Sequence, residues 1–229
     1  MRTSLEALVI VDTQRGFMPA SEGERLQLSG FGELGVNGGE YIVERINRLT
    51  AALSATAGNL IATTQDWHPV HTAHFAAEPN YIDTWPSHCV ANTDGAELHP
   101  DLLVAQQPEL ATRFIKGTEA CTSPADDDSY TGALALNPET GLLLPDYLQQ
   151  HHVRRVYVAG LALGDGDEHP LCVDSTARDL KKQGFEVTLV TDAAEAVFPA
   201  NRATCFANLG RLGVNLATTE EILTVLKDA

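Results

Sequence analysis

Apolar residues follow two alternating patterns along the chain. Residues 7–11 are apolar at every position, which is typical of a strand buried on both faces of a parallel sheet. In residues 41–55 the apolar positions recur at helical spacing, which predicts an amphipathic helix. The same two patterns predict strands at 59–64, 113–116, 153–161, 185–191 and 214–218, and helices at 142–151, 172–183, 201–212 and 220–227.

This alternation of strands and helices is typical of parallel βαβ units with helices packed on both faces of the sheet. We therefore expect a single-domain, three-layer α/β/α fold with a mostly parallel, doubly wound sheet, covering residues 1–229. Two regions, 15–38 and 66–100, carry neither pattern. The second is too long for an ordinary connection, and long loops in compact domains are often functional.

The net charge of the chain limits the kinds of partner that it can bind. The net charge is −16 at pH 7, which argues against nucleic acid or an anionic membrane surface as a partner. No apolar run approaches the roughly 20 residues that span a bilayer, and no cleavage-site pattern precedes the first predicted strand. We expect a cytoplasmic protein that acts on a small molecule, and the sequence leaves a homo-oligomer open.

Polar residues collect where the predicted strands end. Asp12 ends the first strand, Asp66 follows the second, Lys116 ends the third, and Cys172 follows the fourth and opens a helix. In open α/β sheets, ligands bind beyond the carboxyl ends of the strands. Fold logic alone therefore predicts that these residues meet in one crevice.

A second group of polar residues suggests a metal site. Asp66, His68, His74 and His88 lie close together in the long irregular region. A carboxylate and three imidazoles suit a divalent transition metal such as zinc, iron or manganese. The alternative is a histidine-rich loop that packs on the surface without an ion.

Cys172 has two interpretations. A cysteine flanked by Leu171 and Val173 is often a small core residue. At a helix N-terminus, however, the partial positive charge stabilises a thiolate, which favours a nucleophile. Asp12 would then take the thiol proton and Lys116 would stabilise the anion; otherwise both are solvated groups at strand ends.

These motifs together resemble the isochorismatase-like hydrolases, and among them the nicotinamidase/pyrazinamidase branch. ALVIVDTQRGF, with Asp12, is similar to the first strand of the family, and FIKGTE supplies the family lysine as Lys116. TTQDWHPVHTAHF and WPSHCVANTDGAELHPDL resemble its metal-binding region, DDDSYTG its DSYS-type segment, and CVDSTARDL the helix that carries the nucleophile, Cys172.

The resemblance implies an activity. Members of this branch hydrolyse nicotinamide to nicotinate and ammonia through a cysteine thioester, in NAD salvage, and often accept pyrazinamide. One divalent metal, for which we expect zinc, anchors the pyridine nitrogen through Asp66, His68, His74 and His88, and no organic cofactor is implied. By the same resemblance, Asp12, Lys116 and Cys172 are the catalytic residues.

The resemblance also implies how the substrate is held. The backbone N–H groups of Ala162 and Cys172 would bind the oxyanion, with a cis peptide bond between Leu161 and Ala162. Phe17 and Trp85 resemble the aromatic residues that sandwich the ring, although both would equally suit ordinary core packing.

Two departures from the family pattern keep other functions open. Residues 163–171 form an acidic insertion before the nucleophile, and Gly16 stands where many members carry an acidic residue. The chain could be a related cysteine amidohydrolase that acts on another carboxamide or carbamoyl substrate. It could also be a catalytically silent binding protein, or a hydrolase that uses a metal-bound hydroxide.

Overall fold

The computed structural model describes residues 5–227, which are organised around one six-stranded sheet whose neighbouring strands are all parallel. The strands are β1 (Leu5–Val11), β2 (Leu60–Asp66), β3 (Thr112–Lys116), β4 (Val153–Leu163), β5 (Glu186–Ala196) and β6 (Asn215–Ala217). Their order across the sheet is β3-β2-β1-β4-β5-β6. The order reverses between β1 and β4, and in doubly wound sheets ligands bind beyond the carboxyl ends at such a point.

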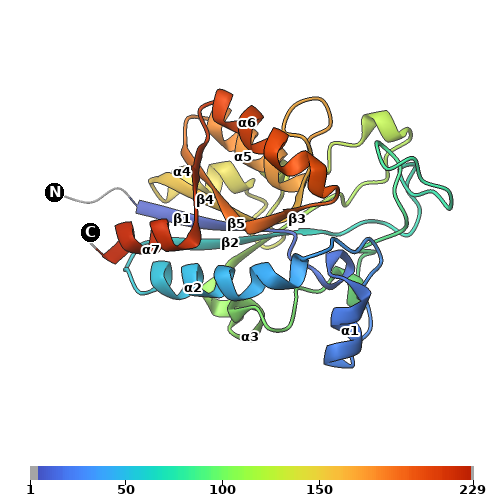
Figure 1. The fold of residues 1–229 in the computed structure, drawn as a ribbon, viewed down its shortest axis with the longest axis horizontal. Coiled ribbons are helices and arrows are strands. Elements are labelled where there is room, and N and C mark those ends of the chain that lie inside the picture. The colour runs from blue at the N-terminus through green and yellow to red at the C-terminus, as the bar shows by residue number, and fades with distance from the viewer. Residues whose placement is uncertain (1–4, 228–229) are drawn as a thin grey trace.

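Helices cover both faces of this sheet, as Figure 1 shows. They are α1 (Ala20–Leu26), α2 (Ile42–Ser54), α3 (Leu103–Gln106), α4 (Leu144–Gln150), α5 (Cys172–Lys182), α6 (Arg202–Arg211) and α7 (Thr219–Lys227). In Figure 1, α2, α3 and α7 lie below the sheet and α4, α5 and α6 lie above it. The prediction of a three-layer, doubly wound α/β/α fold is therefore confirmed.

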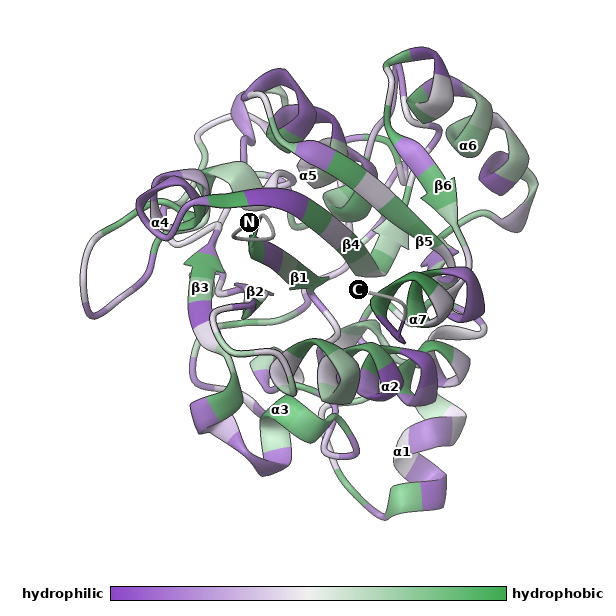
Figure 2. Ribbon diagram, turned by 90° about the vertical axis from the view of Figure 1, so that its left-hand side faces the viewer, coloured by the Kyte–Doolittle hydropathy of each residue, from purple (hydrophilic) through white to green (hydrophobic). Residues whose placement is uncertain are grey.

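The side chains of β1 explain why its sequence is apolar at every position. Val9 and Val11 belong to the core cluster beneath α4, α5 and α6, whereas Leu8 and Ile10 belong to the cluster beneath α2 and α7. Successive side chains of a strand point to opposite faces, so a central strand needs apolar residues throughout. Figure 2 shows the hydrophobic stretches of β1, β4 and β5 lying between the two helical layers.

Every predicted strand and helix is present, but the sequence does not predict two of the helices, and three strands, β2, β4 and β5, extend beyond their predicted ends. The missed helices α1 and α3 are short, and α1 is mostly polar, so neither carries a clear apolar period. β5 continues to Ala196, beyond the predicted end at residue 191. Val158 pairs with Leu189 but Gly160 pairs with Ala194, so a bulge interrupts the strand where its sequence turns polar.

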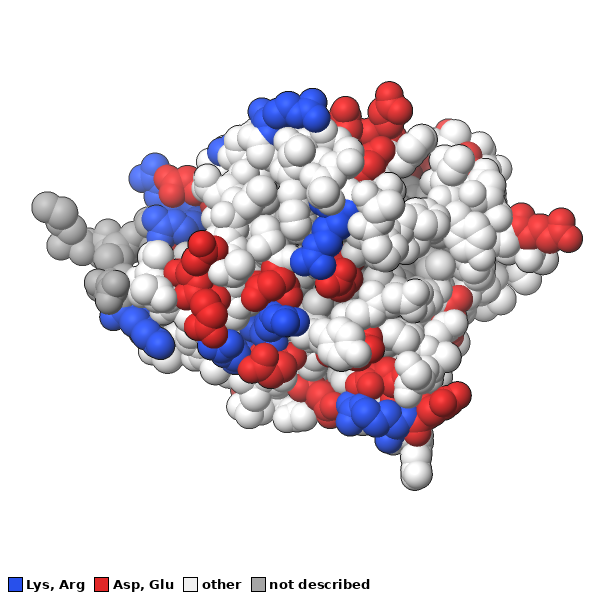
Figure 3. Space-filling model, viewed as in Figure 1, with Lys and Arg blue, Asp and Glu red and all other residues white. Residues whose placement is uncertain are grey.

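The surface reflects the acidic composition. Figure 3 shows acidic side chains spread over one face of the molecule, with basic side chains interspersed among them. Within residues 5–227, no helix has both the length and the apolar character that crossing a membrane requires.

Candidate active site and metal centre

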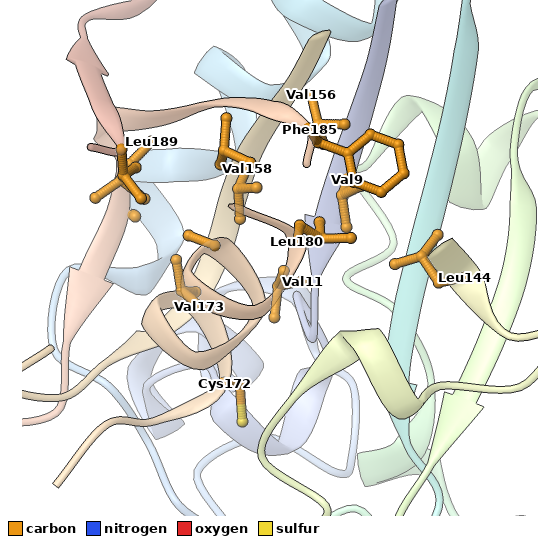
Figure 4. Packing of buried hydrophobic residues seen from close by; sticks show 14 of the residues in the cluster. Val9, Val11, Leu144, Val156, Val158, Cys172, Val173, Leu180, Phe185 and Leu189 are labelled. Carbon is orange, nitrogen blue, oxygen red and sulfur yellow. The ribbon is translucent and has the colours of Figure 1, made fainter. Parts of the chain in front are cut away.

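The four predicted strand-end residues are buried together at the carboxyl edge of the sheet. Asp66 and Lys116 are the last residues of β2 and β3 and pair in register. Asp12 directly follows β1, and Cys172 is the first residue of α5. Figure 4 shows Cys172 at the margin of the apolar cluster, with its sulfur pointing away from Val11 and Val173. The sheet topology thus brings together residues that are distant in sequence.

Lys116 is the centre of this group. Its Nζ lies 2.8 Å from Asp12 Oδ2, donates a hydrogen bond to Asp66 Oδ1, and lies 3.5 Å from Cys172 Sγ. Thr64 Oγ1 donates a 2.6 Å hydrogen bond to the other oxygen of Asp12. Apart from its ion pair, Asp12 Oδ2 has no hydrogen-bond partner among residues 5–227. That oxygen is available to accept a proton.

Burial and neighbouring charges set the protonation of the group. Burial works against the charged form of Lys116, but Asp12 and Asp66 outweigh it and raise the pKa of the lysine. Burial raises the pKa of Asp12, and Lys116 only partly offsets this. Burial also raises the pKa of the Cys172 thiol well above its usual value, against the opposing effect of Lys116.

Burial therefore opposes the stabilisation that a helix N-terminus gives to a thiolate at Cys172. The thiol is buried and faces two carboxylates, which together raise its pKa more than Lys116 lowers it. Cys172 needs a base at the moment of attack. Asp12, whose pKa is raised and whose Oδ2 is bound only by Lys116, meets that need better than an ordinary surface carboxylate would.

Three histidines form a second cluster beside the first. One ring nitrogen from each of His68, His74 and His88 lies within 4.8 Å of the others, and all three residues are buried. Asp66 stands between the clusters: Oδ1 pairs with Lys116, while Oδ2 lies 3.5 Å from His68 Nε2. Of the four predicted metal ligands, the structure thus places three histidines in one tight group and the carboxylate at its side.

Hydrogen bonds orient these rings. His68 Nδ1 donates to Gly117 O at 3.2 Å, and His88 Nδ1 donates to Pro86 O at 2.7 Å. A proton held on Nδ1 leaves the Nε2 lone pair free for a metal. Burial lowers the pKa of His88 to about 3, so this ring is neutral at physiological pH.

The donor set fits a divalent metal ion. His74 Nδ1 lies 3.3 Å from Asp127 Oδ2, whereas its Nε2 is buried without a hydrogen-bond partner in the described part of the chain. A buried polar atom without a partner is costly, and a metal ion would satisfy it. Neutral imidazoles with a neighbouring carboxylate are ligands that zinc and iron accept.

Both clusters open into one cavity. Cys172 and the three histidines line it, together with Phe17 and Trp85. The Phe17 and His88 rings lie 5.2 Å apart between centroids, and Trp85 Nε1 donates a 2.8 Å hydrogen bond to Tyr130 Oη. The predicted nucleophile, metal ligands and aromatic residues thus face the same space.

Comparison with known proteins agrees with this arrangement. The Isochorismatase domain family matches residues 135–221. The nicotinamidase of Acinetobacter baylyi is 34% identical over 83% of this chain and 81% of its own length. The chain belongs to the isochorismatase-like hydrolases. Among solved structures, the pyrazinamidase of Pyrococcus horikoshii in complex with zinc is 33% identical, with a TM-score of 0.71 and coverage of 93% and 98%. The PnC1 of L. infantum in complex with nicotinate is 30% identical, with a TM-score of 0.69 and coverage of 95% and 94%.

The peptide bond expected from the hydrolase family is present: Leu161–Ala162 is cis. The acidic insertion before Cys172 does not carry Ala162 away from the site. Ala162, Leu171 and Cys172 all line the cavity, while the tip of the insertion, residues 167–169, is exposed.

The structure also accounts for Gly16. A Cβ atom at this position would lie 2.7 Å from Glu33 Oε2 and 2.9 Å from Cys89 Sγ. Glu33 accepts a 2.8 Å hydrogen bond from the Cys89 N–H, next to the metal-site residue His88. Glu33 and Cys89 therefore occupy the space that a side chain at position 16 would need.

Sequence reasoning misses two further residues of this site. Glu33 belongs to an irregular region and carries no pattern of its own. Tyr130 lines the cavity and holds Trp85, and it lies in the DDDSYTG segment, whose resemblance to the family is the one signal that points to it.

Proposed function

We propose that this hydrolase is a nicotinamidase, which converts nicotinamide and water to nicotinate and ammonia. The observation that carries the proposal is one cavity lined both by Cys172, with Asp12 and Lys116 behind it, and by three histidines suited to a metal. The first group supplies acyl-transfer chemistry. The second offers an anchor for a ring nitrogen at a fixed distance from it.

The reaction begins at Cys172. Asp12 takes the thiol proton as Sγ attacks the carboxamide carbon, and the oxygen of the tetrahedral intermediate accepts hydrogen bonds from the Ala162 and Cys172 N–H groups. When the C–N bond breaks, Asp12 returns the proton to the leaving nitrogen and ammonia departs. Water then attacks the thioester and Asp12 accepts a proton from it. When the C–S bond breaks, Asp12 returns this proton to Sγ, which restores the thiol, and the acid product leaves as nicotinate after losing its proton to solvent.

Lys116 supports both roles of Asp12. Its ammonium lies 2.8 Å from Asp12 Oδ2 and 3.5 Å from Cys172 Sγ, so it stabilises whichever of the two carries the negative charge. A fixed cation at this position needs no rearrangement as the proton moves from sulfur to oxygen.

We propose zinc as the resident metal, held by His68, His74 and His88 with Asp66 at their side. When bound, the metal supplies a Lewis-acid contact for the pyridine nitrogen and so orients the amide toward Cys172. Phe17 and Trp85 provide apolar surfaces for the ring, and the hydrogen bond from Trp85 to Tyr130 fixes one of them.

Ammonia release from nicotinamide by the zinc-loaded protein tests the proposal. We expect release by the wild type, its loss in Cys172→Ala with zinc content retained, and a decrease in His68→Ala that accompanies loss of zinc. His151→Ala is the matched control for the second variant, because this histidine is exposed and does not line the cavity. Activity that survives in Cys172→Ala would instead favour hydrolysis by a metal-bound hydroxide. No release by a zinc-loaded wild type would point to another carboxamide or carbamoyl substrate.

A further inference from the structure

The acidic insertion between β4 and α5 folds back on itself. Asp165 Oδ1 accepts hydrogen bonds from the N–H groups of Asp167 and His169, both at 2.9 Å. The two ends of the segment meet, since a Cβ atom on Gly164 would lie only 2.8 Å from Leu171 N. The segment therefore leaves β4 and re-enters α5 at almost the same point.

One buried carboxylate ties these ends together. Asp174, the third residue of α5, is fully buried. Its Oδ1 accepts hydrogen bonds from Gly164 N–H at 3.0 Å and Leu171 N–H at 2.9 Å, and its Oδ2 accepts one from Gly166 N–H at 2.8 Å. Three backbone donors on both sides of the insertion thus converge on a single side chain.

Three backbone N–H groups point at the Asp174 carboxylate and favour its ionised form. Burial raises the pKa of Asp174 to about 6, and the N–H groups of Gly164 and Leu171 limit the rise. The titratable groups around it are the Cys205 thiol of α6, whose pKa burial and Asp174 raise, and the Asp165 carboxylate of the insertion. All three hydrogen bonds from the backbone to Asp174 favour its ionised form over the protonated one.

The residues next to these contacts belong to the active site. Ala162 precedes Gly164 by two positions, and Cys172 directly follows Leu171. Both Ala162 and Cys172 line the cavity. β4 holds Ala162 and α5 holds Cys172, and the contacts of Asp174 tie together the chain that joins these two elements.

We propose that Asp174 is a positioning residue that clamps the insertion and keeps the N–H groups of Ala162 and Cys172 side by side for the oxyanion. This role rests on the proposed function, because the oxyanion forms only if Cys172 attacks a carbonyl. Asp174 touches no substrate atom and acts through the backbone of residues 164–171.

The test is Asp174→Asn, compared with Asp179→Asn on the same helix. An amide keeps one acceptor oxygen but turns an NH₂ donor toward a backbone N–H. Asp179 instead interacts with Arg178 and Lys182, so its substitution leaves the insertion intact. Amide hydrogen exchange over residues 164–171, kcat and KM for nicotinamide, zinc content and alkylation of Cys172 are measured on all three proteins.

We expect faster exchange in the insertion and a kcat roughly 10–100-fold lower in Asp174→Asn, the size of effect that a misplaced oxyanion donor causes. KM, zinc content and Cys172 alkylation should stay near wild-type values, as they should for Asp179→Asn. Unchanged exchange or unchanged kcat overturns the proposal, and so does a parallel loss of activity, zinc and thiol reactivity, which would indicate a merely structural role.

A second test uses the insertion itself. Deleting residues 165–169 removes the segment that needs clamping, so Asp174→Asn should cost much less activity in the shortened chain than in the full one. If Asp174→Asn lowered activity equally in both chains, the proposal would be overturned. It would also be overturned if the shortened chain were active but unfolded once Asp174→Asn was added, because Asp174 would then be needed for folding. If the wild type does not hydrolyse nicotinamide, the proposed function fails, while hydrogen exchange still decides whether Asp174 clamps the insertion.

Discussion

Replacement of Lys116 by methionine probes the charge balance of the site most sharply. Lys116 is the cation that lies between two buried carboxylates, at 2.8 Å from Asp12 Oδ2 and in a direct ion pair with Asp66. Without Lys116, the carboxylates of Asp12 and Asp66 lie in a buried site with no cation between them, and they repel each other. Removing one partner of a buried ion pair typically costs about 3–5 kcal/mol.

For a protein of this size, 1 kcal/mol changes Tm by about 2–4 °C, so Lys116→Met should lower Tm by roughly 6–20 °C at pH 8. The loss should shrink as the pH falls. Asp12 already has a raised pKa, and without Lys116 it rises further. An acid whose folded-state pKa is raised destabilises the fold when it is ionised, and protonation on lowering the pH relieves this.

Denaturant unfolding of the zinc-free proteins between pH 8 and pH 5 measures this effect. Lys182→Met is the matched control, because this side chain is 63% exposed and its loss should change stability by no more than about 0.5 kcal/mol. If Lys116→Met lowered the free energy of unfolding by less than about 1 kcal/mol, or by more as the pH falls, Lys116 would not be the cation that stabilises the two buried carboxylates.

Two further predictions concern Asp12 as the base and Trp85 as a residue that binds the substrate ring. Asp12 must be ionised to accept the thiol proton, so kcat/KM should be retained above the raised pKa of Asp12 and lost as the pH falls through it. Asp12→Asn should lower kcat by roughly 10²–10⁴-fold at every pH. If the variant kept activity with the same loss of kcat/KM at low pH as the wild type, Asp12 would not be the base. Tyr130→Phe leaves the Trp85 N–H without its acceptor at a cost of about 1 kcal/mol, so kcat/KM should fall by roughly fivefold. The matched control is Tyr147→Phe, whose hydroxyl pairs with Thr112 away from the cavity, and an equal effect of both substitutions would count against Trp85 as a ring-binding residue.

The parts of the fold that the sequence predicts are those in which one local pattern decides the structure. The continuous apolar run of β1 favours a strand buried on both faces, and its buried side chains agree. The site follows from the same logic, because parallel strands bring Asp12, Asp66 and Lys116 to one edge whatever their distance in sequence.

The unpredicted parts depend on contacts between residues that carry no local pattern. Glu33 fills the space beside Gly16 through a loop, and Asp174 reads in sequence as an ordinary polar residue of a helix. The environment of the Cys172 thiol could not be predicted for a related reason. A helix terminus can be located from sequence, whereas burial beside two carboxylates, which raises the pKa of this thiol, cannot.

The central claim is that Cys172 forms a covalent intermediate, and mass spectrometry of the acid-quenched enzyme during turnover tests it directly. Nicotinamide should add the mass of one nicotinoyl group to the zinc-loaded wild type, on the peptide that contains Cys172, and Cys172→Ala should gain nothing. Turnover of nicotinamide by Cys172→Ala, or an adduct on Cys89, Cys121 or Cys205 instead, would contradict the account.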